Sequence, residues 1–242
     1  MIESLLLTTT PVIAFHGEVV LEKATGFFFQ HADKLFLVTN QHVISPGGDV
    51  LAADRIEFAV HLMSEGPART KSVSVDLGAR GARWRHGYDS RGEIDIAAVE
   101  IDQDVLPEDA VFECFTADNL LRPVTRVEVG ESLLLVGYPN GEANDRYGLP
   151  IVRQASLASS FGLRFDGQGY FLTDAATHRG MSGAPVVLRD ACGQRDMPWK
   201  LLGVHSATFD LVPAAERLER GLDLNCTWYA DILSLLTGPE LH

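Results

Sequence analysis

Short apolar runs of strand length, separated by turn residues, are the feature that most constrains the fold of this chain. The runs are rich in Val, Ile, Leu, Phe and Thr, and Gly, Pro, Asp and Asn separate them. Runs such as LFLVT and SLLLVG lack polar alternation, as expected of strands covered on both faces. The predicted strands are 26–30, 34–39, 56–63, 72–77, 94–101, 132–137, 151–158, 170–173, 184–188, 200–206 and 224–229. This density of strands, without a long helical repeat, predicts an all-β barrel or sandwich.

The predicted strands fall into two groups within one domain. Residues 102–125 look least like strand, because they contain Pro107, Asp109, Asp118 and Pro123. We therefore expect a first half at about 1–105, a linker at about 106–119 and a second half at about 120–227.

Helix is expected mainly at the C-terminal end. Residues 228–237 place Ile232, Leu233, Leu235 and Leu236 on one flank, and Gly238-Pro239 ends the pattern. The segment 213–220 is a second, short and charged helical candidate.

Composition and charge exclude some classes of function. With 242 residues and 46% hydrophobic content, the chain can bury a sizeable core. The formal charge is -13, and no Lys/Arg block supplies the basic face of a nucleic-acid binder. The segment WRHGY at 84–88 is interpreted as a surface loop rather than as a nucleic-acid patch. We attribute the acidic charge to solubility.

The N-terminus and the cysteines favour a reducing, cytoplasmic setting. Residues 1–15 have no basic flank and do not resemble a signal peptide, and no apolar stretch approaches the length of a membrane span. Cys114, Cys192 and Cys226 are an odd, widely spaced set with neither disulfide nor zinc-site spacing. We therefore expect no metal and no cofactor.

Three short motifs contain residue types that suit nucleophilic catalysis. In FLVTNQHVI (36–44), His42 follows an apolar strand at a turn, where one ring edge can face solvent and the other a buried partner, as a general base requires. In GEIDIAAVEI (92–101), Asp95 interrupts an apolar run. A buried carboxylate needs a strong partner, and a histidine that becomes charged during turnover is one.

The third motif is the most specific. In THRGMSGAPVV (177–187), Gly180 and Gly183 bracket Ser182 ahead of an apolar strand. Glycine permits a turn that directs two N–H groups at one point, where negative charge would develop on a carbonyl oxygen attacked by Ser182. This arrangement predicts an oxyanion hole formed by the N–H groups of Gly180 and Ser182. For each motif taken alone, a structural histidine, a strand-edge aspartate and a plain glycine turn are the alternatives.

Together, the motifs resemble trypsin-like serine peptidases, in particular the bacterial branch of HtrA proteases and glutamyl endopeptidases. TNQHV, DIA and GMSGAPVV carry the resemblance, and VGES…VGYP (129–139) and LGVHS (202–206) support it. The resemblance spans roughly residues 10–236 and is dense only around these motifs.

The resemblance implies two six-stranded antiparallel β-barrels with a short C-terminal helix. His42, Asp95 and Ser182 would form the catalytic triad between the barrels, with a covalent acyl-enzyme intermediate. It also implies that Ser206 hydrogen-bonds Asp95, and that 206–208, with Ala207 and Thr208, pair with an extended substrate. The chain would thus be a serine endopeptidase that acts on protein or peptide substrates.

The sequence departs from the secreted members of the family at Met181. Where zymogen-type members have an aspartate that pairs with a new N-terminus, methionine cannot, so we expect no activation by N-terminal cleavage. The alternatives for ordering the oxyanion hole are the substrate or an activating partner protein, through the loops at 164–169 and 177–180.

Primary specificity is left open between two readings. Ala176 stands where trypsin has its acidic specificity residue, which argues against Arg/Lys preference. Thr177 and His205 resemble the hydroxyl and histidine with which glutamyl endopeptidases receive a carboxylate. The alternative is a small apolar pocket beside a core histidine.

A catalytically silent binding or scaffold protein on the same fold is the competing class of function. It would hold an extended segment in the cleft by strand addition. The intact triad and both oxyanion glycines favour the enzyme. Neither nucleic acid nor membrane is expected as a partner.

Overall fold

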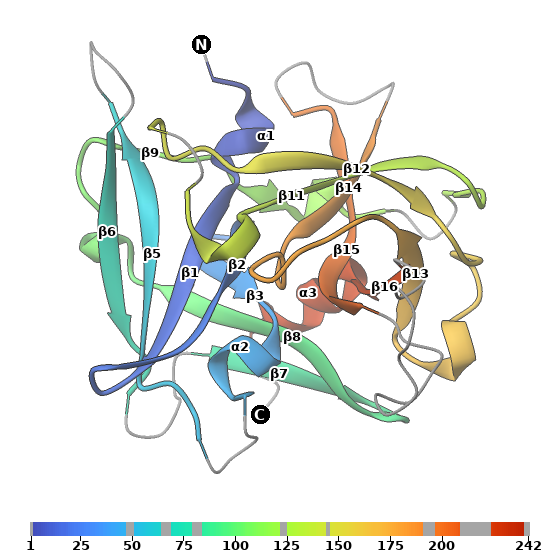
Figure 1. The fold of residues 1–242 in the computed structure, drawn as a ribbon, viewed down its shortest axis with the longest axis horizontal. Helices are drawn as coiled ribbons and strands as arrows, with labels where there is room; N and C mark the ends of the chain where they lie inside the picture. Colours follow the sequence, from blue (N-terminus) through green and yellow to red (C-terminus); the bar gives the residue numbers. More distant parts are fainter. Residues whose placement is uncertain are drawn as a thin grey trace.

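The computed structural model describes residues 2–46, 51–63, 69–78, 84–121, 125–143, 146–190, 197–208 and 224–239. The described chain forms two β structures that pack against each other, with the N-terminal strands on one side and the C-terminal strands on the other (Figure 1). The helical candidate at 213–220 and Cys192 lie outside the described residues.

The first half is a nine-stranded antiparallel sheet with one parallel addition. Seven strands follow the order β6 (Arg69–Asp76), β5 (Arg55–Leu62), β1 (Thr9–His16), β2 (Val19–His31), β3 (Lys34–Thr39), β8 (Gly92–Ile101) and β7 (Trp84–Asp89). The short strands β9 (Ala110–Val111) and β10 (Phe115–Thr116) pair with β5 and β2, the latter in parallel. The short helix α1 (Ser4–Leu7) precedes the sheet, and α2 (Gln41–Ile44) follows β3.

The second half is a closed six-stranded barrel. Its order is β11 (Ser132–Gly137), β12 (Ile151–Leu157), β13 (Tyr170–Asp174), β16 (Leu224–Tyr229), β15 (Trp199–Thr208) and β14 (Pro185–Arg189), and β14 closes onto β11. The all-β class and this barrel are confirmed. The first half departs in detail from the expected six-stranded barrel, because β1, β7, β9 and β10 add strands that the apolar pattern did not predict.

The core explains why the central strands lack polar alternation. Neighbouring side chains in a strand point to opposite faces. In β2, Phe28 enters the core of the first half, whereas Phe27 and Phe29 enter the cluster between the two halves. In β3, Leu37 and Phe36 divide in the same way. Each fully buried side chain of this size contributes roughly 1.5–3 kcal/mol, so these strands fix one half against the other.

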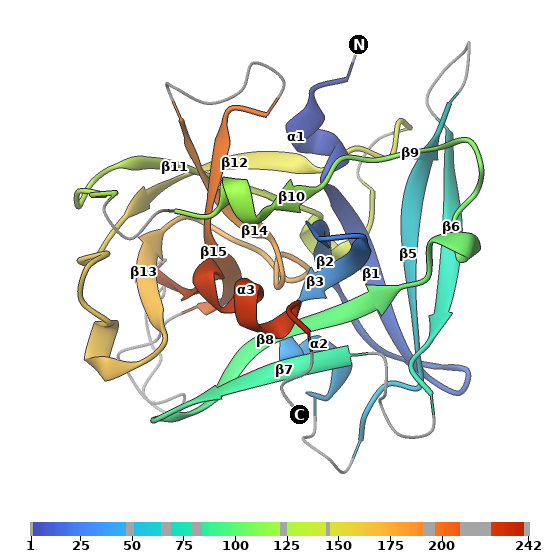
Figure 2. The same cartoon turned by 180° about the vertical axis from the view of Figure 1, so that it is seen from behind.

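Two local expectations are corrected. The C-terminal helix begins later than residue 228, because Trp228 and Tyr229 still pair with β13 and β15, and a 3-10 turn η6 (Ala230–Ile232) leads into α3 (Leu233–Leu236). The segment 84–88, expected as a loop, is strand β7 on the edge of β8. Figure 2 shows α3 over β8, where Leu233 and Leu236 join the cluster between the halves. No helix within the described ranges is long and apolar enough to span a bilayer.

Candidate active site

His42 lies in the short helix α2, which begins at Gln41, two residues after β3 ends at Thr39. Val43 and Ile44 are fully buried and anchor this short helix in the core of the first half. The side chain of His42 is 38% exposed, so its ring reaches the surface of the protein. The imidazole ring of His42 therefore has one buried edge and one solvent-facing edge, as the sequence predicts.

The carboxylate of Asp95 accepts three hydrogen bonds from described residues. Its Oδ1 accepts from the backbone N–H of His42 at 2.9 Å, and its Oδ2 bonds His42 Nδ1 at 2.8 Å. The hydroxyl of Ser206 donates to the same Oδ2 at 2.5 Å. On β8, Asp95 stands between Ile94 and Ile96, and the side-chain amide of Asn40 donates to its carbonyl at 2.6 Å. These bonds meet the cost of placing a charge in an apolar strand.

Burial and a neighbouring charge act in opposite directions on His42. Burial disfavours the charged imidazolium, but the hydrogen bond and charge of Asp95, with the charge of Glu22, outweigh it and raise the pKa of His42 above its ordinary value of 6.5. The ring is thus a stronger base than a free histidine.

The peptide units around Gly180 are held from both sides. The carbonyl of Arg179 accepts from the backbone N–H of Asn140 at 2.6 Å, and the carbonyl of Gly180 accepts from the hydroxyl of Thr25 at 2.7 Å. Gly180 has a φ of +87°, a left-handed conformation for which glycine is suited. A trans peptide points its N–H opposite to its carbonyl, so the N–H of Gly180 points away from Asn140.

The peptide units around Ser182 are fixed in the same manner. The carbonyl of Met181 accepts from Ala184 N–H at 3.0 Å, and the carbonyl of Ser182 accepts from Thr25 N–H at 2.9 Å. Within the described part of the chain, neither Gly180 N–H nor Ser182 N–H donates to a protein acceptor. Unpaired N–H groups at buried or half-buried positions are rare, and here two of them flank the same hydroxyl.

The hydroxyl of Ser182 donates to the carbonyl of Ser206 at 3.2 Å. Among the described residues, no hydrogen bond joins it to His42. Ser206 therefore contacts both ends of the site, since its hydroxyl bonds Asp95 and its carbonyl bonds Ser182.

Strand β15 is irregular where it passes the site. His205 pairs with Thr227 and Thr208 pairs with Asn225, so Ser206 and Ala207 stand opposite the single residue between them on β16. Such a bulge bends the strand and re-aims its groups. The side chains of Ala207 and Thr208 lie outside the described residues.

The predicted specificity residues lie beside a buried polar cluster. Ala176 is exposed, and the hydroxyl of half-buried Thr177 donates to Asn225 Oδ1 at 2.8 Å. His205 is only 2% exposed, and its Nδ1 has no hydrogen-bond partner among the residues that the structure describes. Burial, with the nearby charge of His42, lowers the pKa of His205 to about 4, so the ring is neutral at pH 7. The remaining members of the cluster are Thr173, Asn225 and Thr227.

Sequence reasoning missed Thr25, Asn140 and Asn225. The dipeptide Asn140-Gly141 signals a left-handed turn, and Asn140 has a φ of +63°. Asn225 and Thr227 alternate along β16, which hints that they share a face. Nothing local distinguishes Thr25 from other strand threonines.

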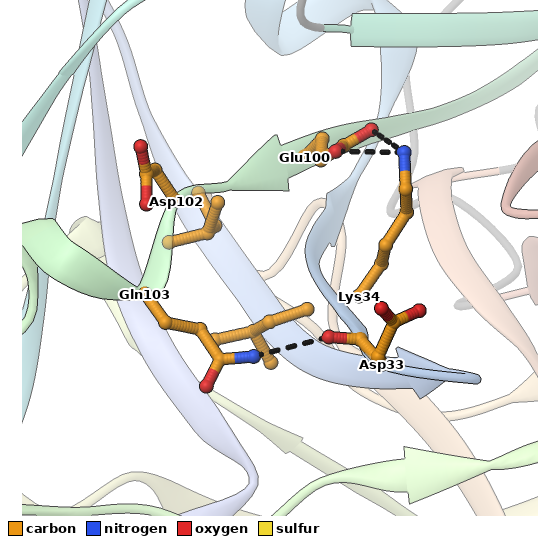
Figure 3. A pocket seen from close by; sticks show the side chains of 7 residues that line it. Asp33, Lys34, Glu100, Asp102 and Gln103 are labelled. Atoms are coloured by element: carbon orange, nitrogen blue, oxygen red, sulfur yellow. Dashed lines mark hydrogen bonds and ion pairs between the residues drawn. The ribbon is translucent and has the colours of Figure 1, made fainter.

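A polar hollow of about 470 Å³ lies at the end of β3 and β8 that is distant from His42 (Figure 3). Lys34 and Glu100 form an ion pair at 2.9 Å across it, and Gln103 donates to the carbonyl of Asp33 at 3.2 Å. His42 and Asp95 lie at the opposite ends of the same strands, so this hollow is separate from the candidate active site. The described residues contain no group of His, Cys, Asp and Glu side chains arranged to hold a metal ion.

Comparison with known proteins bears on the family and the fold. The family model of the trypsin-like peptidase domain matches residues 24–194. A serine endoprotease from Yersinia pestis superposes with a TM-score of 0.56 at 17% identity, over 96% of this chain and 62% of that one. The Rv3671c protease of M. tuberculosis in its inactive form gives 0.52 at 14% identity, over 96% and 87%. The active form of Rv3671c gives 0.52 at 13%, over 98% and 83%. No curated protein matches the sequence.

The fold and the family match together define the class, that of the trypsin-like peptidase domains. The chain belongs to the trypsin-like peptidase domain family, whose model covers more than half of it. It spans 62% of the length of the Yersinia pestis protein. At these identities the solved structures show the shared fold.

Proposed function

We propose that this protein hydrolyses peptide bonds with His42 as general base, Asp95 as its orienting carboxylate and Ser182 as nucleophile. One observation carries the proposal. The Asp95 carboxylate binds both the backbone and Nδ1 of His42, beside a serine flanked by two N–H groups that find no acceptor in the described part of the chain. A purely structural histidine would not require that second feature.

The acylation step follows from these contacts. Asp95 accepts a hydrogen bond from the Nδ1–H of His42, which leaves the lone pair of Nε2 for the serine proton. The hydroxyl of Ser182 turns from the Ser206 carbonyl toward Nε2, a movement that substrate binding favours in enzymes of this kind. Its oxygen bonds to the substrate carbonyl carbon while the proton passes to Nε2. The negatively charged oxygen then accepts from the N–H groups of Gly180 and Ser182.

The intermediate collapses by returning the proton. His42 donates it from Nε2 to the leaving amine as the C–N bond breaks, which leaves an ester on Ser182. A water molecule then loses a proton to Nε2 and attacks the ester carbon. The acid product leaves and Ser182 regains its proton, so the cycle needs no metal or cofactor.

The substrate in this proposal is a protein or peptide segment in extended conformation. The bulge at Ser206 and Ala207 supports pairing with a substrate backbone, because it turns main-chain groups of β15 out of the ladder. The Ser206 carbonyl would accept the N–H of the residue before the cut. That contact displaces the hydroxyl of Ser182 and frees it for His42.

We also propose a polar rather than a large apolar primary pocket. Thr177, His205 and Asn225 supply a hydroxyl, an imidazole and an amide within one cluster. The unpartnered Nδ1 of His205 adds an unmet polar group to it. A fluorogenic peptide panel that varies only the residue before the cut tests this. Glu, Gln or Ser should exceed Leu and Val, and the reverse order would refute a polar pocket.

The proposed activity is tested by covalent labelling of the isolated chain. A fluorophosphonate should modify Ser182, identified by mass spectrometry, and the protein should degrade casein, whereas Ser182→Ala should do neither. Absence of labelling under any condition would support the silent scaffold. Labelling that requires an added partner protein would support the partner-activated alternative.

A further inference from the structure

Among the described residues, Thr25 makes four hydrogen bonds, and two of them join the first half of the molecule to the loop that carries Ser182. It lies in β2 and is fully buried. Its N–H donates to the Ser182 carbonyl at 2.9 Å, and its hydroxyl donates to the Gly180 carbonyl at 2.7 Å. The same hydroxyl accepts from Tyr138 N–H at 2.9 Å, and its carbonyl accepts from the hydroxyl of Thr39 at 2.8 Å.

These bonds hold the peptides that adjoin the two proposed oxyanion N–H groups. Tyr138 directly precedes the turn η3 (Pro139–Gly141), in which Asn140 holds the carbonyl of Arg179. The hydroxyl of Thr25 thus donates to the peptide that follows Gly180. It also accepts from Tyr138, next to the turn that holds the peptide preceding Gly180. With both neighbouring peptides held, Gly180 cannot turn its N–H out of the site without breaking a buried hydrogen bond.

The space around the loop is equally restricted. A Cβ on Gly180 would come 2.1 Å from Gly141 N, and a Cβ on Gly183 would come 2.1 Å from the Thr25 carbonyl. Backbone packs directly on backbone, so Thr25 and the loop move together. Met181, fully buried in the barrel core, adds no charge that would need a partner.

We infer that Thr25 is a positioning residue that keeps the oxyanion hole formed in the isolated chain, without a new N-terminus or a partner protein. The inference rests on the proposed function, because it assigns a cause to the arrangement which that function uses. Its consequence is that the hydroxyl of Thr25 affects the rate of the chemical step rather than substrate affinity.

The test compares three variants of the full chain. Thr25→Val keeps the shape and removes the hydroxyl, and Thr25→Ser keeps a hydroxyl. Thr10→Val is the matched control: Thr10 is 1% exposed, and its hydroxyl likewise donates to a backbone carbonyl and accepts a backbone N–H, both of Ala59, with the Pro11 carbonyl as a second, longer acceptor at 3.2 Å. The readouts are kcat, KM, the melting temperature and the inhibition constant of a peptide aldehyde, whose adduct with Ser182 carries the oxyanion.

We expect Thr25→Val to lower kcat about 10- to 100-fold, somewhat less than the loss of a whole oxyanion donor, with little change in KM and weaker aldehyde inhibition. Thr25→Ser should recover most of kcat. Thr10→Val should lose melting temperature but keep kcat and aldehyde affinity. An active wild type whose kcat survives Thr25→Val would overturn this inference alone. A wild type that neither cleaves peptides nor labels would overturn the proposed function together with it.

Discussion

The hydroxyl of Ser182 donates to the main-chain carbonyl of Ser206 at 3.2 Å, the acceptor that an incoming substrate N–H would need. In the proposed mechanism, the resting hydroxyl of Ser182 therefore occupies a contact that the substrate would use. We therefore expect substrate binding to release the Ser182 hydroxyl toward His42. Ser182 should then become reactive only when a substrate is bound.

Replacing Ser182 by Ala should separate activity from stability. The variant loses the nucleophile, and kcat should fall by about 10⁶-fold. The lost hydrogen bond is single and half-buried, so the free energy of unfolding should change by no more than about 1 kcal/mol. Peptide hydrolysis and urea denaturation measure the two effects. Residual hydrolysis near the wild-type rate would contradict the assigned role.

Replacing Asp95 by Asn should cost kcat about 10⁴-fold, by analogy with the same change in trypsin. An amide can donate to Nδ1 and so favour the wrong tautomer of His42, and it also removes the charge that stabilises the imidazolium. Steady-state kinetics with a fixed peptide measures the loss. Glu100→Gln, at the distant end of β8, is the control and should leave kcat unchanged.

The pH dependence of kcat/KM should show an acid limb above pH 6.5. His42 must be neutral to accept the serine proton, and Asp95 and Glu22 raise its pKa in the folded protein. The rate therefore rises with pH through that pKa. Glu22→Gln removes one source of the shift, so the midpoint should move to lower pH. An unchanged midpoint would show that the charge of Glu22 does not reach the ring.

His205 should make the fold sensitive to acid. Its pKa is about 4 when folded against an ordinary 6.5, so between these values the unfolded chain binds more protons. Its contribution to the free energy of unfolding is therefore present above pH 6.5 and is lost toward pH 4, by up to about 3 kcal/mol. Denaturation at several pH values should show a smaller acid loss in His205→Gln than in the wild type. Parallel curves would rule this out.

Gly180→Ala and Gly130→Ala should separate backbone strain from steric conflict. Their φ values are +87° and +86°, so both substitutions meet the left-handed penalty. A Cβ meets nothing within 4 Å at Gly130 but meets Gly141 N at 2.1 Å at Gly180. We expect a small loss of stability from strain at both positions, a further loss of stability from the clash at Gly180, and a loss of kcat, about 10²-fold, only for Gly180→Ala. Equal kcat values would contradict the packing described here.

The sequence was informative where chemistry and neighbours are local. The apolar runs predicted most of the long strands, because strands buried on both faces need no polar alternation. His42, Asp95 and Ser182 each stand out within a few residues of their own segment, and the fold brings them to a common site through Ser206.

Contacts between distant segments could not be foreseen. Thr25 binds a carbonyl 155 residues away and an N–H 113 residues away, and no local pattern marks it. Strand β7 was missed for a different reason: Arg85 and His86 are only half-buried, so its apolar signal is weak. The predicted start of the last helix was wrong because Trp228 and Tyr229 suit both a helix and a strand, and in the structure they end strand β16.

Under the proposed function, the bulge at Ser206 and Ala207 also limits which protein segments can be cleaved. A helix already uses its N–H and C=O groups internally, and a central strand bonds its own to neighbouring strands. Neither can therefore pair with the backbone of β15 while it stays folded. Under the proposed function, we therefore expect well-folded domains to be spared, and cuts to fall in tails, linkers and chains that have lost their native shape.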